Sequence, residues 1–145
     1  MTSNAKSFPR RYHTVTPYLT VQGADELVGF LRQVFDAQVT ERITRADGMV
    51  AHADVRIGDS IVMLADASSA WKPMPGAIYI YVSDTDATYQ RALQADGISL
   101  MEPADQFHGD RMAGVQDPFG NVWWIVTHIE DVSPDELQKR ADALS

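Results

Sequence analysis

The chain has 145 residues, of which 45% are hydrophobic and 22% charged, with a net charge of -8 and no cysteine. A chain of about 150 residues buries roughly 68 to 70% of its unfolded surface, enough for one well-packed core. The missing cysteines exclude disulfides, zinc–thiolate centres and thiolate nucleophiles, and no apolar run reaches the length of a membrane-spanning helix.

The charge also bears on partners and location. Without a local basic patch, a net charge of -8 excludes phosphate backbones and anionic lipid, so we expect no nucleic acid and no membrane partner. The same charge favours solubility or a cationic ligand. Lys6, Arg10 and Arg11 precede no apolar run, so we expect no secretory signal and a cytoplasmic location.

The first half of the chain predicts one β-α-β-β-β unit over residues 13–65. Alternating polar and apolar residues predict a strand from His13 to Gln22, which Gly23 ends. Helical spacing follows at Leu27, Phe30, Leu31, Val34 and Phe35. Three further strands are predicted at 39–45, 49–57 and 60–65, separated by the turn dipeptides Asp47-Gly48 and Gly58-Asp59.

The second half repeats this pattern over residues 77–129. Residues 66–76, with two prolines and Trp71, predict a linker or a loop at a cavity edge. A strand at 77–82, a helix at 84–96 and strands at 98–102, 111–116 and 122–128 follow. The offset between the halves is close to 61 positions, since Val21 maps to Val82 and Met63 to Trp124.

The tail over residues 130–145 predicts an added helix. Ser133, Pro134 and Glu136 form a capping box with proline at the first helical position. Apolar residues are sparse there, which suggests surface packing or a subunit contact.

Four segments carry a resemblance to a known family: HTVTPYLTV (13–21), HADVRIGDSIVMLAD (52–66), DRMAGVQDPFGNVWWIVTH (110–128) and IEDVSP (129–134). They resemble the PhnB-like branch of the glyoxalase/bleomycin resistance protein/dioxygenase superfamily, the vicinal oxygen chelate (VOC) superfamily. The resemblance implies an α+β fold in which two βαβββ modules form a curved mixed sheet around a cavity, plus the C-terminal helix. It further implies a single VOC domain over residues 1–145 and a homodimer.

Strand alternation then predicts which side chains face that cavity. The first half contributes Thr16, Tyr18, Thr20, His52, Asp54, Arg56, Ile61, Met63 and Ala65. The second half contributes Ala77, Tyr79, Tyr81, Arg111, Ala113, Val115, Val122, Trp124 and Val126. A slip of one residue in any strand would invert its set.

The family's metal ligands are missing from this sequence. Metal-dependent members hold a divalent ion with a His/Glu-type set, and motif alignment places those four positions at Thr16, Met63, Ala77 and Trp124. None of these side chains is a credible ligand for a catalytic cation. We therefore expect no metal and no cofactor, and a cavity with aromatic and apolar walls that suits a small organic molecule.

Three residues are candidate catalytic groups: His52, His108 and Arg111. Each also has a structural interpretation: a hydrogen-bonded histidine for His52, a solvated loop for His108, and an ion pair with Asp54 or Asp110 for Arg111. Asp117 and Asn121 are expected to form a turn. The predicted ligand-binding residues are Thr16, Tyr18, His52, Met63, Trp71, Tyr79, Tyr81, Arg111 and Trp124.

The leading functional hypothesis is a bleomycin-resistance-like protein that binds and sequesters a small, partly aromatic or cationic molecule without metal. The alternative is an enzyme of the superfamily: a lyase or isomerase using His52 or His108 with Arg111, or a dioxygenase-type or other metalloenzyme with a site relocated to His52, Asp54 and His108. A purely structural module would leave the cavity unused.

Overall fold

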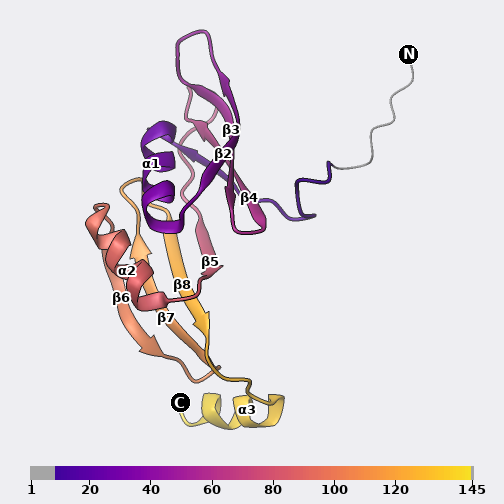
Figure 1. Cartoon of the computed structure of the whole chain (residues 1–145), viewed down its shortest axis with the longest axis vertical. Coiled ribbons are helices and arrows are strands. Elements are labelled where there is room, and N and C mark those ends of the chain that lie inside the picture. The colour runs from indigo at the N-terminus through magenta and orange to yellow at the C-terminus, as the bar shows by residue number, and fades with distance from the viewer. Residues whose placement is uncertain (1–8, 145) are drawn as a thin grey trace. The chain divides into compact units, whose positions relative to one another are not determined.

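The computed structural model describes residues 9–144, which divide into two compact units meeting between Pro75 and Gly76 (Figure 1). The first unit contains β1 (Tyr18–Val21), α1 (Ala24–Phe35), β2 (Gln38–Thr44), β3 (Val50–Ile57) and β4 (Ser60–Asp66). Its strands form one mixed sheet in the order β1-β4-β3-β2, with β1 parallel to β4 and the other pairs antiparallel.

The second unit repeats the arrangement. It contains β5 (Ala77–Tyr81), α2 (Thr85–Gln94), β6 (Ile98–Asp105), β7 (Asp110–Gln116), β8 (Val122–His128) and α3 (Pro134–Asp142). The sheet order is β5-β8-β7-β6, again with only the first pair parallel. The α+β fold, the two βαβββ modules and the C-terminal helix predicted from the sequence are therefore confirmed.

One face of each sheet is covered by the helix of its own unit. The apolar stripe of α1 is buried, with Leu27, Leu31 and Val34 fully inaccessible, and the helix packs against β3 and β4. In the second unit α2 packs mainly against β7. We call the opposite side of each sheet its open face.

The first strand is shorter than predicted. It begins at Tyr18 rather than His13, and residues 13–17 form no strand. Pro17 has no N–H to give to a ladder, and the Thr16 hydroxyl donates to the carbonyl of His13 at 3.0 Å. The Thr16 side chain is therefore engaged by its own local backbone.

The orientation predicted for β7 is wrong. Gly114 pairs directly with Trp124, so these two residues share the open face, and the alternate residues Ala113 and Val115 are fully buried on the helix side. Arg111 belongs to this buried set by alternation, and it reaches Asp86 of α2 at 2.9 Å. This strand has Arg111 on one face and Gly114 on the other, and hydrophobic patterning alone does not show which of the two faces the helix covers.

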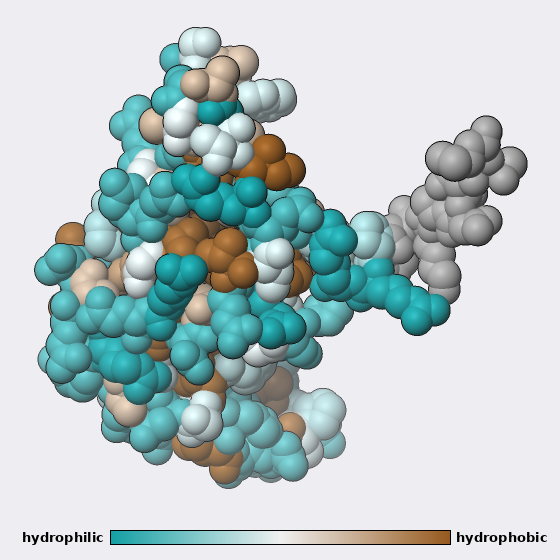
Figure 2. Space-filling view, turned by 45° about the horizontal axis from the view of Figure 1, so that its top comes forward, coloured by the Kyte–Doolittle hydropathy of each residue, from teal (hydrophilic) through white to brown (hydrophobic). Residues whose placement is uncertain are grey.

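Hydrophilic residues cover much of the visible surface, with hydrophobic residues exposed between them in patches (Figure 2). Within residues 9–144, the helices are too short or too polar to cross a membrane.

Candidate functional site

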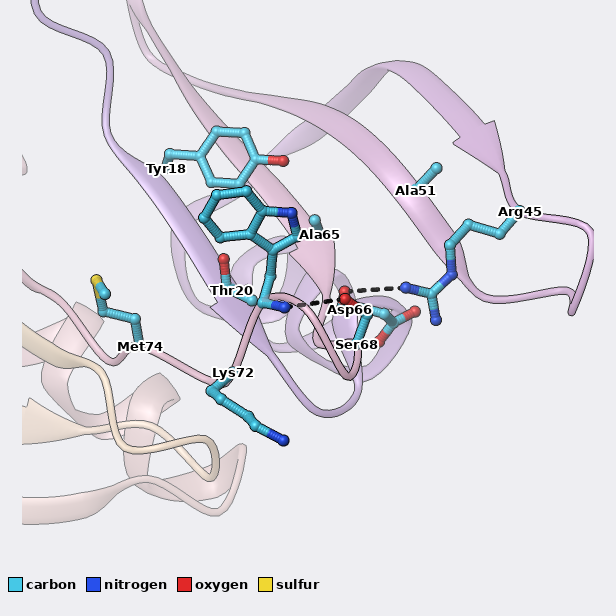
Figure 3. A pocket seen from close by; sticks show the side chains of 10 residues that line it. Tyr18, Thr20, Arg45, Ala51, Ala65, Asp66, Ser68, Lys72 and Met74 are labelled. Atoms are coloured by element: carbon cyan, nitrogen blue, oxygen red, sulfur yellow. Dashed lines mark hydrogen bonds between the residues drawn. The ribbon is translucent and has the colours of Figure 1, made fainter.

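The first unit contains a pocket of about 730 Å³ on the open face of its sheet (Figure 3). Its apolar and aromatic lining comes from Tyr18, Ala51, Ala65, Trp71 and Met74. Its polar lining comes from Thr20, Arg45, Asp66, Ser68 and Lys72. This size and this mixture of mostly apolar walls with a few polar groups are those of small-molecule sites.

The sheet supplies the floor of the pocket. Thr20 of β1 pairs with Ala65 of β4, so both side chains project from the same face. Ala51 also lines the pocket, although it is next to His52 and simple alternation would place the two side chains on opposite faces. The β2–β3 pairing is irregular next to Ala51, between Ile43 and Thr44, and such an irregularity re-aims side chains locally.

The segment between β4 and β5 forms the remaining wall. It returns to the sheet edge, where the Met74 N–H donates to the Thr20 carbonyl at 2.9 Å. A tight turn holds Trp71, whose N–H donates to Ser68 Oγ at 3.1 Å while its carbonyl accepts from Ser68 N–H at 2.8 Å. Trp71 remains 75% exposed and Tyr18 50% exposed, so two aromatic side chains at this pocket are available to a ligand.

Asp66 is buried beside the pocket, and its charge is already used. Its two carboxylate oxygens accept hydrogen bonds from the backbone N–H groups of Gly23, Ala24 and Val50, at 3.1, 2.8 and 2.7 Å. Burial alone would raise its pKa, but these three bonds outweigh burial and hold the pKa of Asp66 below its usual range. The carboxylate is thus ionised and committed to the start of α1 and of β3.

Arg45 enters the pocket from the β2–β3 turn, and Figure 3 shows it extending toward Asp66. One guanidinium nitrogen donates to the carbonyl oxygens of Asp66 and Ala67, at 3.3 and 3.4 Å. The side chain also pairs with Asp47, at 3.2 Å. These contacts fix the guanidinium in place.

A second polar cluster surrounds Asp54 on the same open face. Asp54 is completely buried and accepts hydrogen bonds from the Tyr12 hydroxyl, from His52 Nε2 at 2.7 Å and from Arg11 Nε at 3.4 Å. Glu41 lies opposite Asp54 on β2, 3.7 Å from the Arg11 guanidinium. The cluster ties the segment before β1 to the centre of the sheet.

Hydrogen bonding sets the protonation of this cluster. Burial alone would raise the pKa of Asp54, but the bonds from Tyr12 and His52 outweigh burial and lower it. The same bond to Asp54 raises the pKa of the Tyr12 hydroxyl. Asp54 is therefore an ionised acceptor that fixes the orientation of the His52 ring, and its own oxygens are occupied.

Several predicted site residues of the first half do share one face. Tyr18, Met63 and Asp54 occupy one row across the sheet, and His52 stands beside Tyr18 with ring centroids 5.9 Å apart. Thr16 does not join them, because it precedes β1. Trp71, predicted both as a loop residue and as a ligand-binding residue, lines the pocket.

The predicted aromatic residues of the second half occupy the open face of their own sheet. Tyr79 pairs with Trp124, and the Tyr79 and Tyr81 rings meet edge to face at 5.5 Å. Gly114 makes room for the indole, because a Cβ at this position would lie 2.4 Å from Trp124 Cζ3. Trp123, by contrast, is fully buried in the core.

Asp110 is the polar centre of the second unit. Its carboxylate accepts from the Tyr79 hydroxyl at 2.8 Å, lies 2.8 Å from His128 Nδ1 and is 3.4 Å from His108 Nδ1. His108, in the turn before β7, thus has Asp110 as a structural partner. His128 is half-exposed and lies between two carboxylates, because its Nε2 is also 2.7 Å from Asp131.

Two further predicted residues have structural contacts. Arg111 pairs with Asp86 and Asp105, both at 2.9 Å, on the helix side of the sheet and not with either aspartate expected from the sequence. Asp117 organises the turn before β8 by accepting from the backbone of Phe119 and Asn121 and from Trp123 Nε1. Asp117 and Asn121 are therefore turn formers.

The positions that the family resemblance assigns to a metal do not suit one. Met63 and Trp124 lie on open faces but offer a thioether and an indole, and Ala77 offers no donor. A different set, Glu41, His52 and Asp54, has ligand atoms within 4.8 Å of one another. Arg11 and Tyr12 already contact this set, so a cation there would have to displace a guanidinium.

Sequence reasoning missed part of the site. Arg45, Ser68, Lys72 and Met74 line the pocket but lie in turns and in the segment between β4 and β5, where no periodic pattern identifies a facing side chain. Arg11 and Tyr12 were equally hidden, because their partner Asp54 is more than forty positions away. The two prolines around Met74 were the available signal that this segment is held in one conformation.

Comparison with known proteins agrees with this geometry. Residues 11–125 match the Glyoxalase/Bleomycin resistance protein/Dioxygenase superfamily. The chain therefore belongs to this superfamily. It is 34% identical over 135 residues to the proteins Mb0911c of Mycobacterium bovis and Rv0887c of Mycobacterium tuberculosis. The match covers 86% of this chain, 89% of the first relative and 79% of the second.

Solved structures share the fold. TioX from Micromonospora sp. ML1 is similar with a TM-score of 0.67 and 26% identity, covering 81% of this chain and 99% of TioX. A PhnB protein from Bacillus cereus is similar with a TM-score of 0.63 and 17% identity, covering 79% of this chain and 99% of that one.

The His128 contacts predict a pH-dependent contribution to stability. Hydrogen bonds to Asp131 and Asp110 raise the pKa of His128 in the folded state. Its stabilising effect is therefore fully present below the unfolded pKa of about 6.5 and is lost as the pH rises through the higher folded value. Urea unfolding should show that His128→Gln destabilises the protein more at pH 5.5 than at pH 9.

Asp131→Asn provides the comparison, because it removes one of the two carboxylates and keeps the ring. We expect it to show the same trend with a smaller amplitude. An equal loss at both pH values in His128→Gln would contradict a charged histidine between the two aspartates.

Proposed function

We propose that this protein binds and sequesters a small, partly aromatic molecule in the pocket of the first unit. The observation that carries the proposal is the pocket of about 730 Å³ with two exposed aromatic side chains, Tyr18 and Trp71, at its walls. Membership of the superfamily is compatible with this function, because it includes proteins named for bleomycin resistance. Met63 and His52, which share the face of Tyr18, are proposed to extend the contact surface.

Binding should depend on Trp71 and Tyr18. Isothermal titration with naphthoate, naphthamide and naphthylmethylammonium tests one ring system at three charges. At least one of them should bind saturably, and Trp71→Ala or Tyr18→Ala should weaken it roughly fivefold, the loss of an aromatic contact of about 1 kcal/mol. Both side chains are at least half exposed, so neither variant removes a core contact.

Tyr81→Ala is the matched control, since Tyr81 is 65% exposed and lies in the second unit. Affinity that falls in Tyr81→Ala and not in the Trp71 variant would move the site to Tyr79, Tyr81 and Trp124. Ligand contact by Tyr79, Tyr81 and Trp124 is untested and stays a prediction.

The second candidate function is catalysis at the Asp54 cluster. The observation that favours it is the close approach of Glu41, His52 and Asp54, a combination of donors that divalent cations accept. His52 contacts Asp54 through Nε2, and within residues 9–144 its other ring nitrogen has no hydrogen-bond partner and is available to act on a proton. Arg11 weighs against a metal, because it brings a permanent positive charge to the same carboxylates.

Metal content separates these functions. Protein purified without metal-affinity steps should carry less than about 0.1 equivalent of zinc, nickel, manganese or iron, because neither the family positions nor the Asp54 cluster offers a free donor set. Mass spectrometry of the acid-digested protein measures this. Stoichiometric metal that disappears in His52→Ala would instead support a relocated metal site.

We further propose that the two units form a single domain and that this domain is a homodimer. The proposal rests on the superfamily, whose βαβββ modules pair around a cavity. Sedimentation at tens of micromolar should give a species of twice the 16.1 kDa chain mass. A monomer at that concentration would count against the dimer.

A further inference from the structure

The charges around the pocket of the first unit are unequally engaged, and this difference bears on the ligand. Three charged side chains line the pocket: Asp66, Arg45 and Lys72. A ligand charge is attracted most by a nearby group that has no other partner, because a paired charge has lost most of its field. The engagement of each of the three therefore indicates the sign of the ligand.

Asp66 cannot serve as the partner of a cationic ligand. Its oxygens accept from three backbone N–H groups at 2.7 to 3.1 Å, and the residue is only 7% exposed. Two of those donors are at the start of α1, where the helix dipole also stabilises the negative charge. A ligand cation would have to compete with bonds that hold the fold together.

Arg45 is held in place but is not saturated. Four contacts engage it: two with backbone carbonyls of Asp66 and Ala67, and two with the carboxylate of Asp47. A guanidinium carries five N–H donors, so within residues 9–144 these contacts leave at least one donor available. Because the side chain is already fixed, a further hydrogen bond to a ligand oxygen costs little conformational entropy.

Lys72 is the unpaired charge at the pocket. It is exposed, it follows Trp71 directly in sequence, and within residues 9–144 its ammonium has no hydrogen-bond or ion-pair partner. Its long stem allows the ammonium to reach a group bound against the indole. The unneutralised charge at the pocket is therefore positive, although the chain as a whole carries -8.

We propose that the pocket selects a planar aromatic molecule that carries an acidic group, with Lys72 and the remaining donor of Arg45 recognising the acid. This inference rests on the proposed function, since it names the ligand class of that same site. The net negative charge does not oppose it, because exposed charges beyond a Debye length of about 8 Å are screened at physiological ionic strength. Groups lining the pocket act within that distance.

The three naphthalene probes test the sign of the ligand directly, because they share a ring and differ in charge. Naphthoate should bind at least about fivefold more tightly than naphthamide, and naphthylmethylammonium should bind most weakly. Lys72→Gln should remove most of the preference of naphthoate over naphthamide. The preference should also fall as sodium chloride is raised.

Lys139→Gln is the matched control, since it makes the same charge change at an exposed lysine on α3 of the other unit. An equal loss in both lysine variants would overturn the assignment to Lys72. Equal affinities for all three probes, each weakened by Trp71→Ala, would overturn the acid preference and leave the proposed function standing. Failure of every probe to bind in a Trp71-dependent way would overturn both.

Discussion

Each unit is organised by a side chain at the end of its last strand that holds the start of its helix. In the first unit Asp66 of β4 accepts from the backbone of Gly23 and Ala24, at the start of α1. In the second unit Thr127 of β8 accepts from the Thr85 N–H at 3.0 Å, at the start of α2. These contacts fix the helix against the sheet and so determine which face of the sheet remains open.

The side chains that hold the two helices, Asp66 and Thr127, differ in charge, and this difference affects the pocket of the first unit. Thr127 is neutral and completes its bonding by donating to the Val82 carbonyl at 2.9 Å. Asp66 is ionised, takes a third bond from Val50 and draws Arg45 to its backbone carbonyl. The pocket of the first unit therefore lies beside two charged side chains that the backbone engages. Backbone N–H groups stabilise the negative charge of Asp66, and backbone carbonyls hold Arg45 in place. Such a site is preorganised, because its charged groups need not rearrange when a ligand enters.

Much of the fold was predictable because the sequence repeats and local patterns agree with it. The helix positions from Leu27 to Phe35 and the glycine-containing turns specify the elements, and the offset between Met63 and Trp124 specifies the repeat. The site was less predictable. Strand alternation placed Tyr18, His52 and Met63 on one face correctly. It failed at β7, where Arg111 was expected on the open face but Gly114 lies there, under Trp124.

The remaining site residues could not be predicted for a physical reason. Arg45, Lys72 and Met74 lie in turns or in the segment between β4 and β5, where side-chain direction depends on tertiary contacts such as the Met74 bond to Thr20. Likewise, Tyr12 reaches Asp54 only because the chain folds back over the sheet. A pattern of period two or 3.6 carries no information about such contacts.

Equivalent positions on the open faces of the two sheets carry different side chains. The row that contains Tyr18, Met63 and Asp54 in the first unit corresponds to Tyr79, Trp124 and Gly114 in the second. With glycine in place of aspartate, this row of the second unit has no carboxylate, and the indole has the space to lie across the strand. A large aromatic side chain thus fills the face of one sheet, while the other keeps a charged cluster at its centre and a pocket at its edge. In the first unit, the centre of the open face is consequently tied to the chain's own Arg11 and Tyr12, and the pocket beside Trp71 is left for a ligand.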